Sequence, residues 1–288
     1  PWVDHFILVD RAAVKQRWLR DPAWSYSHMA GVMAEVRRQR FDIAFDLQGA
    51  AKSVVFLYGA HASRKFVKGR WPGIDGFRDP DLHALDEMDG VLELAGIRHV
   101  DTRMEFATSP EEQSSIDSLL ARLNPMAMPV IILSPFTRWA SKDWPLDSFL
   151  ESGSSFTSDH CVIVTGARDR TDEIDAGIDG IACSKIQNLA GKLSLGEFAE
   201  LVRRADLMLS GDSFPMHVAV ACGTQVIALF GPTEESRVGP RDGESSVLRA
   251  PDCRKCDRPD CNRGCLAKIP VSDVVSQIQQ ALVARNEE

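Results

Sequence analysis

The chain has 288 residues, 44% of them apolar, and its 33 basic and 41 acidic side chains give a net charge of −8. This length favours two domains of ordinary size, and the apolar fraction is enough for substantial cores. The acidic balance argues against sequence-independent binding of nucleic acid, which requires clustered cations, and no apolar run approaches the roughly 20 residues that span a bilayer.

The first part of the chain alternates short apolar runs with helical patterns. Residues 6–9 and 43–45 predict buried strands. Four apolar residues between them recur at helical spacing and predict one face of a helix: Met29, Val32, Met33 and Val36. Further helices are predicted over residues 83–95 and from Ser109, which is followed by Pro110 and two acids, a typical helix start.

Two prolines interrupt the pattern at residues 123–129, and we place the domain boundary there, with domains at 1–125 and 129–288. The strand pattern then restarts at 130–133, 162–165, 207–209 and 226–230. Ser194 and Glu197 form a capping box that opens a helix to Ala205. Ser272 is expected to cap a last helix over 272–285, for which packing back onto the first domain is one option.

Strands that alternate with helices predict parallel sheets with helices on both faces. The fold class is therefore α/β, with two Rossmann-like domains that face a cleft. The chain begins at Pro1 directly on a predicted strand, so we expect the first strand of the N-terminal domain to lie upstream.

Residues 207–233 contain the first candidate site. The turn Gly211-Asp212-Ser213 follows a strand and precedes a helix that begins near Pro215. Free N–H groups at that helix start make an anion site. His217, one helical turn further on, is placed to face the same ligand, and Gly231 and Thr233 end the next strand at the same edge of the sheet. The alternative is an ordinary helix cap with an interior histidine.

Residues 134–145 provide the second candidate site, because they follow the strand 130–133. Ser134, Thr137, Arg138 and Lys142 supply hydroxyl and cationic donors within nine positions. Such donors at one sheet edge suit a diphosphate. A solvated loop is the alternative.

These two segments, SPFTRWASKDWP at 134–145 and SGDSFPMHVAVACGTQVIALFGPT at 210–233, resemble the nucleotide-site motifs of glycosyltransferase family 9, the heptosyltransferases of lipopolysaccharide core assembly. Residues 41–53, which include Gln48 and Lys52, residues 82–97, which include His83, and the cysteines before the last helix also resemble that family. The resemblance covers nearly the whole chain.

The resemblance implies a GT-B fold and an inverting, metal-independent transfer of a sugar, heptose above all, from an ADP-sugar to a lipid-linked glycan acceptor. It implies that Thr137 and Lys142 bind the diphosphate. Asp212, Ser213 and the amides after them would bind phosphate or sugar hydroxyls. The other implied donor-site residues are Ser134, Arg138, Gly166 with Arg168 or Asp169 near the ribose, Phe214, His217, Gly231 and Thr233. On the acceptor side the resemblance implies Gln48, Lys52 and His83. The acceptor places the enzyme in the cytoplasm, at the inner membrane.

The chain departs from the family pattern in two ways. Phe214 stands where the family usually has glycine, which allows a backbone to approach a phosphate closely. The family's Gly-Asp loop, with its general base, is expected upstream of Pro1, so residues 1–288 alone are expected to turn over little, with Asp46 as the alternative base. A non-catalytic homologue that binds a sugar nucleotide or a partner protein is the rival hypothesis. A dehydrogenase is disfavoured, because no Gly-x-Gly-x-x-Gly follows a strand.

Seven cysteines are present, and two of them, Cys161 and Cys222, sit in apolar runs typical of a core. Four others follow one another closely: Cys253, Cys256, Cys261 and Cys265. Four clustered thiolates suit structural zinc, but the spacings are tighter than those of ordinary zinc ribbons. Reduced or partly disulfide-linked cysteines are the other option.

Overall fold

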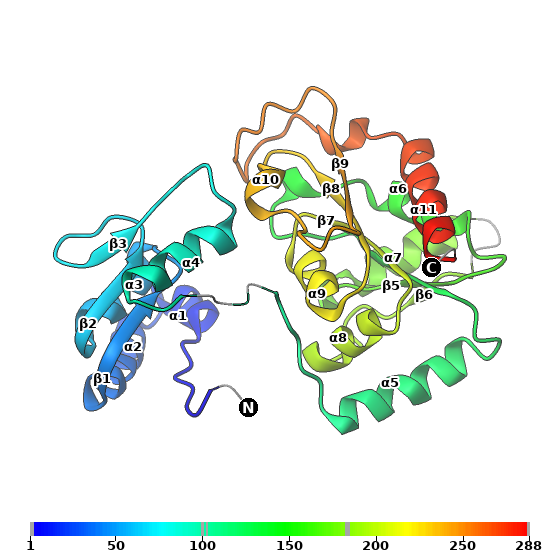
Figure 1. Cartoon of the computed structure of the whole chain (residues 1–288). Coiled ribbons are helices and arrows are strands. Elements are labelled where there is room, and N and C mark those ends of the chain that lie inside the picture. The colour runs from blue at the N-terminus through cyan, green and yellow to red at the C-terminus, as the bar shows by residue number, and fades with distance from the viewer. Residues whose placement is uncertain (1–2, 99–100, 102, 182–184, 287–288) are drawn as a thin grey trace. The chain divides into compact units, whose positions relative to one another are not determined.

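The computed structural model describes residues 3–98, 101, 103–181 and 185–286. The chain divides into two compact units, Pro1–Thr102 and Arg103–Glu288 (Figure 1). The sequence pattern placed the domain boundary at the proline-containing segment 123–129. The structure divides the chain earlier, between residues 102 and 103. The reason is the helix α5 (Pro110–Leu123), whose Ile116 is buried in the core of the second unit.

A three-stranded parallel sheet forms the centre of the first unit, in the order β1-β2-β3. Its strands are β1 (Arg40–Asp46), β2 (His61–Lys68) and β3 (Asp75–Phe77). The helices are α1 (Arg11–Arg17), α2 (Pro22–Arg38), α3 (Ala51–Gly59) and α4 (Ala84–Leu94). Val54 and Leu57 of α3 pack on one face of the sheet, and Val91 of α4 packs on the other.

The predicted strand at residues 6–9 is wrong. These residues form no regular element, and Phe6 and Leu8 are 69% and 82% exposed. A strand needs a hydrogen-bonded neighbour, and no described strand of this unit pairs with residues 6–9. The helix predicted from Met29 to Val36 is confirmed as α2. It begins where the Asp21 carboxylate accepts a hydrogen bond from the Trp24 amide.

The second unit contains a six-stranded parallel sheet in the order β6-β5-β4-β7-β8-β9. Its strands are β4 (Val130–Ser134), β5 (Cys161–Val164), β6 (Gln187–Asn188), β7 (Leu207–Gly211), β8 (Val226–Phe230) and β9 (Ser246–Arg249). Counted along the chain within this unit, the order is 3-2-1-4-5-6, the doubly wound Rossmann arrangement. The direction in which the chain adds strands reverses between β4 and β7.

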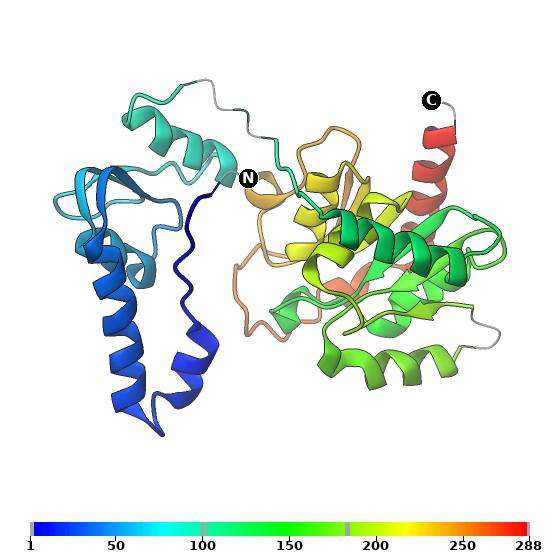
Figure 2. The ribbon, with the colours of Figure 1, turned by 90° about the horizontal axis from the view of Figure 1, so that it is seen from below.

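Alternate residues of the central strands face different helices. Ile131 and Leu133 of β4 pack in a core with α6 (Leu146–Ser154), α7 (Thr171–Asp179) and α11 (Val271–Asn286). Val130 and Ile132 pack with α5, α8 (Leu195–Arg203) and α9 (Phe214–Cys222) on the opposite face. Figures 1 and 2 show these two helical layers around the sheet. The continuous apolar runs of these strands follow from burial on both faces.

Side-chain caps set two helix starts of this unit. The capping boxes of α5 (Ser109 with Glu112) and α8 (Ser194 with Glu197) are both formed. The expected cap at Ser272 is wrong, because α11 already begins at Val271, directly after Pro270. The apolar face of α11 packs against α6 in the second unit. Short elements complete the unit: η1 (Ala140–Lys142), η2 (Arg168–Arg170), α10 (Glu235–Val238) and η3 (Leu266–Lys268).

Candidate functional site

The two segments singled out by the sequence meet where the strand order reverses. β4 and β7 pair in parallel register, with Ser134 opposite Ser210, so the loops that follow them leave the sheet side by side. In doubly wound sheets, ligands bind at this point. The approach is close at Gly211, where an added Cβ would lie 2.9 Å from Thr137 Cγ2 and 3.2 Å from the Lys142 carbonyl oxygen. Glycine at this position therefore lets the two loops pack together.

A buried charge pair joins the two loops. Lys142 Nζ lies 2.6 Å from Asp212 Oδ2, and the Thr233 hydroxyl donates to the same oxygen at 2.5 Å. The Lys142 side chain is 15% exposed and that of Asp212 is 6% exposed. The Lys142 ammonium also lies 4.3 Å from the centroid of the Trp139 ring. Asp212 thus fixes the position of one cation and one hydroxyl at the sheet edge.

The loop that carries Lys142 is tied together by Thr137. The Thr137 amide donates to Asp143 Oδ1 at 2.8 Å, and its hydroxyl donates to the Trp139 carbonyl at 2.8 Å. Burial raises the pKa of the Asp143 carboxyl, and its hydrogen bonds with Thr137 partly oppose that shift. Thr137 was predicted to bind a diphosphate. In the structure, its amide and its hydroxyl hold the loop together.

The start of α9 has no side-chain cap. Ser213 occupies the N-cap position, but its hydroxyl lies 3.5 Å from the Gly211 carbonyl and makes no cap hydrogen bond. Asp212, the other capping residue at this turn, is engaged with Lys142 instead. The first-turn amides of α9, next to the Lys142 ammonium, are a favourable place for an anion.

A cavity of about 540 Å³ adjoins this turn. Its lining is largely apolar, and it includes Phe136, Leu189, Leu193, Leu195, Phe198, Phe214 and Pro215 with Ser134, Thr137, Thr165, Gly166, Ala167, Asp169, Arg170 and Ser194. The Arg170 guanidinium lies 4.7 Å from the centroid of the Phe136 ring. Such a volume with a few polar groups suits a small organic ligand.

The predicted donor-site residues fall into two groups. The first group lines the cavity and consists of Ser134, Thr137, Gly166, Asp169 and Phe214. Arg168, the alternative to Asp169, does not line it. Lys142, Asp212 and Thr233 form the polar cluster beside it, together with the Gly231 turn and Ser213. Arg138 is exposed, and His217 is half-buried on α9; neither lines the cavity. Phe214 is 52% exposed and forms part of the cavity lining rather than filling it.

Sequence reasoning missed the residues that hold the turn Gly231–Thr233. Arg249 of β9 donates to the Gly231 carbonyl at 2.7 Å and also to the Thr233 carbonyl. Its guanidinium pairs with Glu235. Donation from Arg249 lowers the pKa of the Glu235 carboxyl to about 2. An arginine on a short strand and a glutamate on a four-residue helix show no pattern that would have revealed them.

The predicted acceptor-side residues lie in the first unit. Asp46, at the end of β1, is 7% exposed, and its Oδ1 accepts hydrogen bonds from the amides of Gln48 and Gly49, both at 2.8 Å. Lys52 is exposed on the first turn of α3. His83 is the N-cap of α4, where Nδ1 accepts from the Leu85 amide at 3.2 Å.

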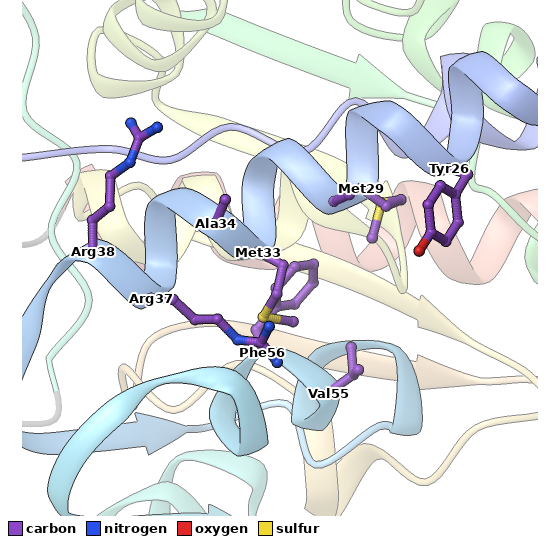
Figure 3. Close-up of a pocket in the computed structure, with 9 residues that line it drawn as sticks. Tyr26, Met29, Met33, Ala34, Arg37, Arg38, Val55 and Phe56 are labelled. Carbon is purple, nitrogen blue, oxygen red and sulfur yellow. The ribbon is translucent and has the colours of Figure 1, made fainter.

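A larger cavity, of about 620 Å³, lies between α2 and α3 of the first unit (Figure 3). Apolar side chains such as Met33 and Phe56 line it, with Arg37 and Arg38 at one end. No histidine, cysteine or carboxylate belongs to this lining. Since this lining lacks those groups and lies far in sequence from the two predicted segments, we place the candidate site at the smaller cavity beside Lys142.

The four clustered cysteines line a cavity of about 200 Å³ in the second unit. Among the described residues, no group of three or more His, Cys, Asp or Glu side chains is arranged to hold a metal ion. Cys161 is buried as expected, and Cys222 is half-buried; burial raises the pKa of both thiols. None of the described helices is both long and apolar enough to cross a bilayer.

Comparison with known proteins gives a consistent result. The family model described as "Glycosyltransferase family 9 (heptosyltransferase)" matches residues 81–267. The lipopolysaccharide core heptosyltransferase OpsX of Haemophilus influenzae is 23% identical over 275 residues, which cover 90% of this chain and 78% of that protein.

Two solved structures share the fold. A glycosyl transferase family 9 protein from Veillonella parvula superposes with a TM-score of 0.78 at 20% identity, over 92% of this chain and 80% of that one. The Escherichia coli heptosyltransferase WaaC, solved with ADP, superposes with a TM-score of 0.71 at 19% identity, over 96% and 83%. The predicted fold class, α/β with the two Rossmann-like domains of the GT-B type, is confirmed.

Proposed function

This chain belongs to glycosyltransferase family 9, and we propose that it transfers a heptose from ADP-heptose to an acceptor of the lipopolysaccharide core, with inversion at the anomeric carbon. The observation that carries the proposal is the junction of β4 and β7. There, a largely buried ammonium, an uncapped helix start and a cavity of about 540 Å³ lie together. This combination suits a nucleoside diphosphate.

The cavity beside Phe136 is the proposed nucleoside site. Its apolar lining can pack against a base, and Asp169 offers a carboxylate to the ribose hydroxyls. The diphosphate would then lie between the start of α9 and Lys142. Ser213 and Thr233 are next to that position, and Ser213 has a hydroxyl that no helix cap uses. Arg138 and His217 complete the proposed donor site at its rim.

Asp212 is proposed as a positioning residue rather than as a phosphate ligand. A carboxylate repels a diphosphate, but this one accepts hydrogen bonds from Lys142 and Thr233 through a single oxygen. The pair is held in place before any ligand binds. Preorganised charge of this kind stabilises a transition state without the cost of rearrangement.

The proposed chemistry follows from this geometry. An acceptor hydroxyl attacks the anomeric carbon, the bond to the diphosphate oxygen breaks, and a carboxylate takes the hydroxyl proton. Negative charge grows on the departing ADP, where Lys142 and the α9 amides stabilise it. The role of Lys142 is therefore catalytic, whereas Phe136 and Phe214 serve affinity.

The first unit is proposed to bind the acceptor. Gln48 and Lys52 follow β1 at the carboxyl edge of its sheet, and Asp46 fixes the turn at Gln48 and Gly49. His83, at the start of α4, is proposed as a third acceptor-side residue. A lipid-linked acceptor would place the enzyme at the cytoplasmic face of the inner membrane.

The test is a calorimetric titration with ADP and ADP-heptose, with UDP as the control nucleotide. We expect both adenine ligands to bind in the micromolar range and UDP to bind at least tenfold more weakly. Transfer is then measured as ADP release and as the mass gain of a heptose-deficient core acceptor. Lack of binding by both adenine ligands would refute the donor assignment, and ADP release without a gain in acceptor mass would refute the acceptor class.

A further inference from the structure

One face of α2 lines the cavity of about 620 Å³ in the first unit (Figure 3). The α2 residues in this lining recur at helical spacing, so they form a single stripe along the helix. The first part of this stripe consists of Tyr26, Met29, Ala30, Met33 and Ala34. These side chains are apolar apart from the Tyr26 hydroxyl. We call the cavity between this stripe and α3 the α2–α3 groove.

The opposite wall of the α2–α3 groove comes from α3. Val55 and Phe56 belong to the lining, and Val55 is 46% exposed. Gly59, one helical turn after Phe56, allows α2 to come close, because a Cβ added there would lie 2.2 Å from Met33 Sδ. The two helices therefore pack closely at Met33. The groove is thus built on two helices rather than on a loop.

Two guanidinium groups lie at one end of the α2–α3 groove. Arg37 and Arg38 continue the stripe at the C-terminal end of α2, and Figure 3 shows the Arg37 side chain extending toward Phe56. Both arginines are exposed, and within the described residues neither forms an ion pair with a carboxylate. The lining contains no acidic side chain. An apolar groove with unpaired cations at one end is complementary to an anionic amphiphile.

The length of the groove matches one acyl chain. Tyr26 and Arg37 lie eleven positions apart on α2, and a rise of about 1.5 Å per residue separates them by about 16 Å. The hydrocarbon core of a bilayer is about 30 Å thick, so the chains of one leaflet span about 15 Å. The volume of the groove also falls within the roughly 300–1,000 Å³ that is typical of small-molecule sites.

The charge distribution favours a lipid that belongs to an anionic bilayer. The chain has a net charge of −8, so an anionic surface repels the protein as a whole. Residues 37–40, in contrast, contain three arginines and no acid. A local cationic group beside exposed apolar side chains is the feature that attracts a protein to an anionic membrane surface.

We propose that the α2–α3 groove binds one acyl chain of an anionic phospholipid. Arg37 and Arg38 hold the phosphate, and the chain lies along Met33 and Met29 toward Tyr26. Methionine side chains are flexible and polarisable, which suits a flexible hydrocarbon chain. The binding is non-covalent and involves no residue of the donor site, so it stands independently of the proposed transfer reaction.

The first experiment is a calorimetric titration of the full chain with dodecyl phosphate, below the concentration at which it forms micelles. Dodecyl maltoside serves as the neutral amphiphile with the same chain, and inorganic phosphate as the head without a chain. We expect dodecyl phosphate to bind, dodecyl maltoside to bind more weakly by about tenfold or more, and inorganic phosphate not to bind. Lack of dodecyl phosphate binding, equal affinity for both amphiphiles, or equal affinity for inorganic phosphate would overturn the proposal.

A pair of double variants tests the cationic end. Arg37→Gln with Arg38→Gln should lower the affinity for dodecyl phosphate by about 25-fold, at roughly fivefold for each cation removed. Arg70→Gln with Arg78→Gln makes the same charge change at two exposed arginines outside the lining, and it should leave the affinity unchanged. An equal loss in both double variants would mean that net charge, and not the groove, attracts the ligand.

A second pair of variants tests the apolar part. Ala30→Trp places a large ring in the groove and should weaken dodecyl phosphate binding by about tenfold or more. Because Ala30 is exposed, urea unfolding should show little loss of stability. Ser27→Trp adds the same ring at an exposed position of α2 outside the lining and should bind like the natural chain. Unchanged binding by Ala30→Trp, or an equal loss in Ser27→Trp, would place the chain elsewhere and overturn the proposal.

The source of the lipid is tested by sedimentation with vesicles. Phosphatidylglycerol vesicles should retain the natural chain and displace dodecyl phosphate, whereas phosphatidylcholine vesicles and Ala30→Trp should show little retention. Displacement by a heptose-deficient core acceptor but not by phosphatidylglycerol would assign the groove to the lipid of the acceptor instead. A lipid-free dimer in ultracentrifugation that Ala30→Trp dissociates would assign it to a second copy of the chain. Either result would overturn the proposal.

Discussion

Replacing Lys142 with glutamine separates the catalytic role of the ammonium from its structural role. Glutamine keeps a polar side chain of related length, but it leaves the Asp212 carboxylate without its counter-charge. At 2.6 Å and an effective dielectric constant of about 20, the charge pair has a Coulomb energy of roughly 6 kcal/mol before desolvation. Desolvation offsets part of this, so removal of one partner should lower the free energy of unfolding by about 3 kcal/mol.

The effect on catalysis should be larger than the effect on binding. Lys142 is proposed to act on charge that develops only as ADP leaves, so kcat should fall by about 10²–10³, the loss typical of one removed stabilising group. ADP affinity should fall by about tenfold, equivalent to 1.4 kcal/mol. Turnover is followed as ADP release, affinity by calorimetry and stability by urea unfolding.

Asp212→Asn and the double variant complete a cycle. Asp212→Asn keeps one hydrogen bond to Lys142 and should cost less in kcat than Lys142→Gln, because the ammonium remains. The double variant should be more stable than the sum of the single losses predicts, since it leaves no buried charge unpaired. If Lys142→Gln keeps kcat within twofold while its stability falls, the catalytic role is wrong and the pair is purely structural.

Three further variants test the surroundings of this pair. Phe214→Ala removes part of the cavity lining, and we expect ADP affinity to fall by about five- to tenfold by calorimetry, with little loss of stability because the ring is half-exposed; tighter binding would mean that Phe214 narrows the site. Gly231→Ala places a Cβ 2.2 Å from buried Leu266, so we expect a loss of about 1–3 kcal/mol in urea unfolding, whereas Gly31→Ala, whose Cβ meets nothing within 4 Å, should cause no loss. The pKa of Glu235 is lowered from 4.5 to about 2, so its ion pair stabilises the fold above pH 4.5 and that stability is lost as the pH falls toward 2. Glu235→Gln should therefore flatten the stability profile in that window, and an unchanged acid profile would contradict the assignment.

Local patterns predicted most of the second unit. The apolar runs of β4, β7 and β8 are continuous because both faces of the sheet are covered, and the capping boxes at Ser109 and Ser194 satisfy the amides of their own helix starts. These signals depend on neighbours in the chain, so they could be found without a structure. In the first unit the same reasoning failed at residues 6–9, because an apolar run becomes a strand only when another strand bonds to it.

The candidate site was predictable only in part. The turn at Gly211 and the cation at Lys142 were visible because each follows a strand. The role of Asp212 was not, since its partners Lys142 and Thr233 come from two other loops. Arg249 was missed for the same reason. The division between the units was also missed, because α5 packs on α8 through contacts between residues that are distant in sequence.

The sequence by itself determined most strands and helices of the second unit and the turn at Gly211, because periodicity, caps and glycines act over a few residues. The tertiary structure decided that β4 lies beside β7, and therefore that Lys142 meets a carboxylate seventy positions later. It also decided that scattered apolar residues such as Phe136 and Phe198 enclose one cavity. The physical reason is that strand order and side-chain pairing are set by the packing of the whole unit, which no local pattern encodes.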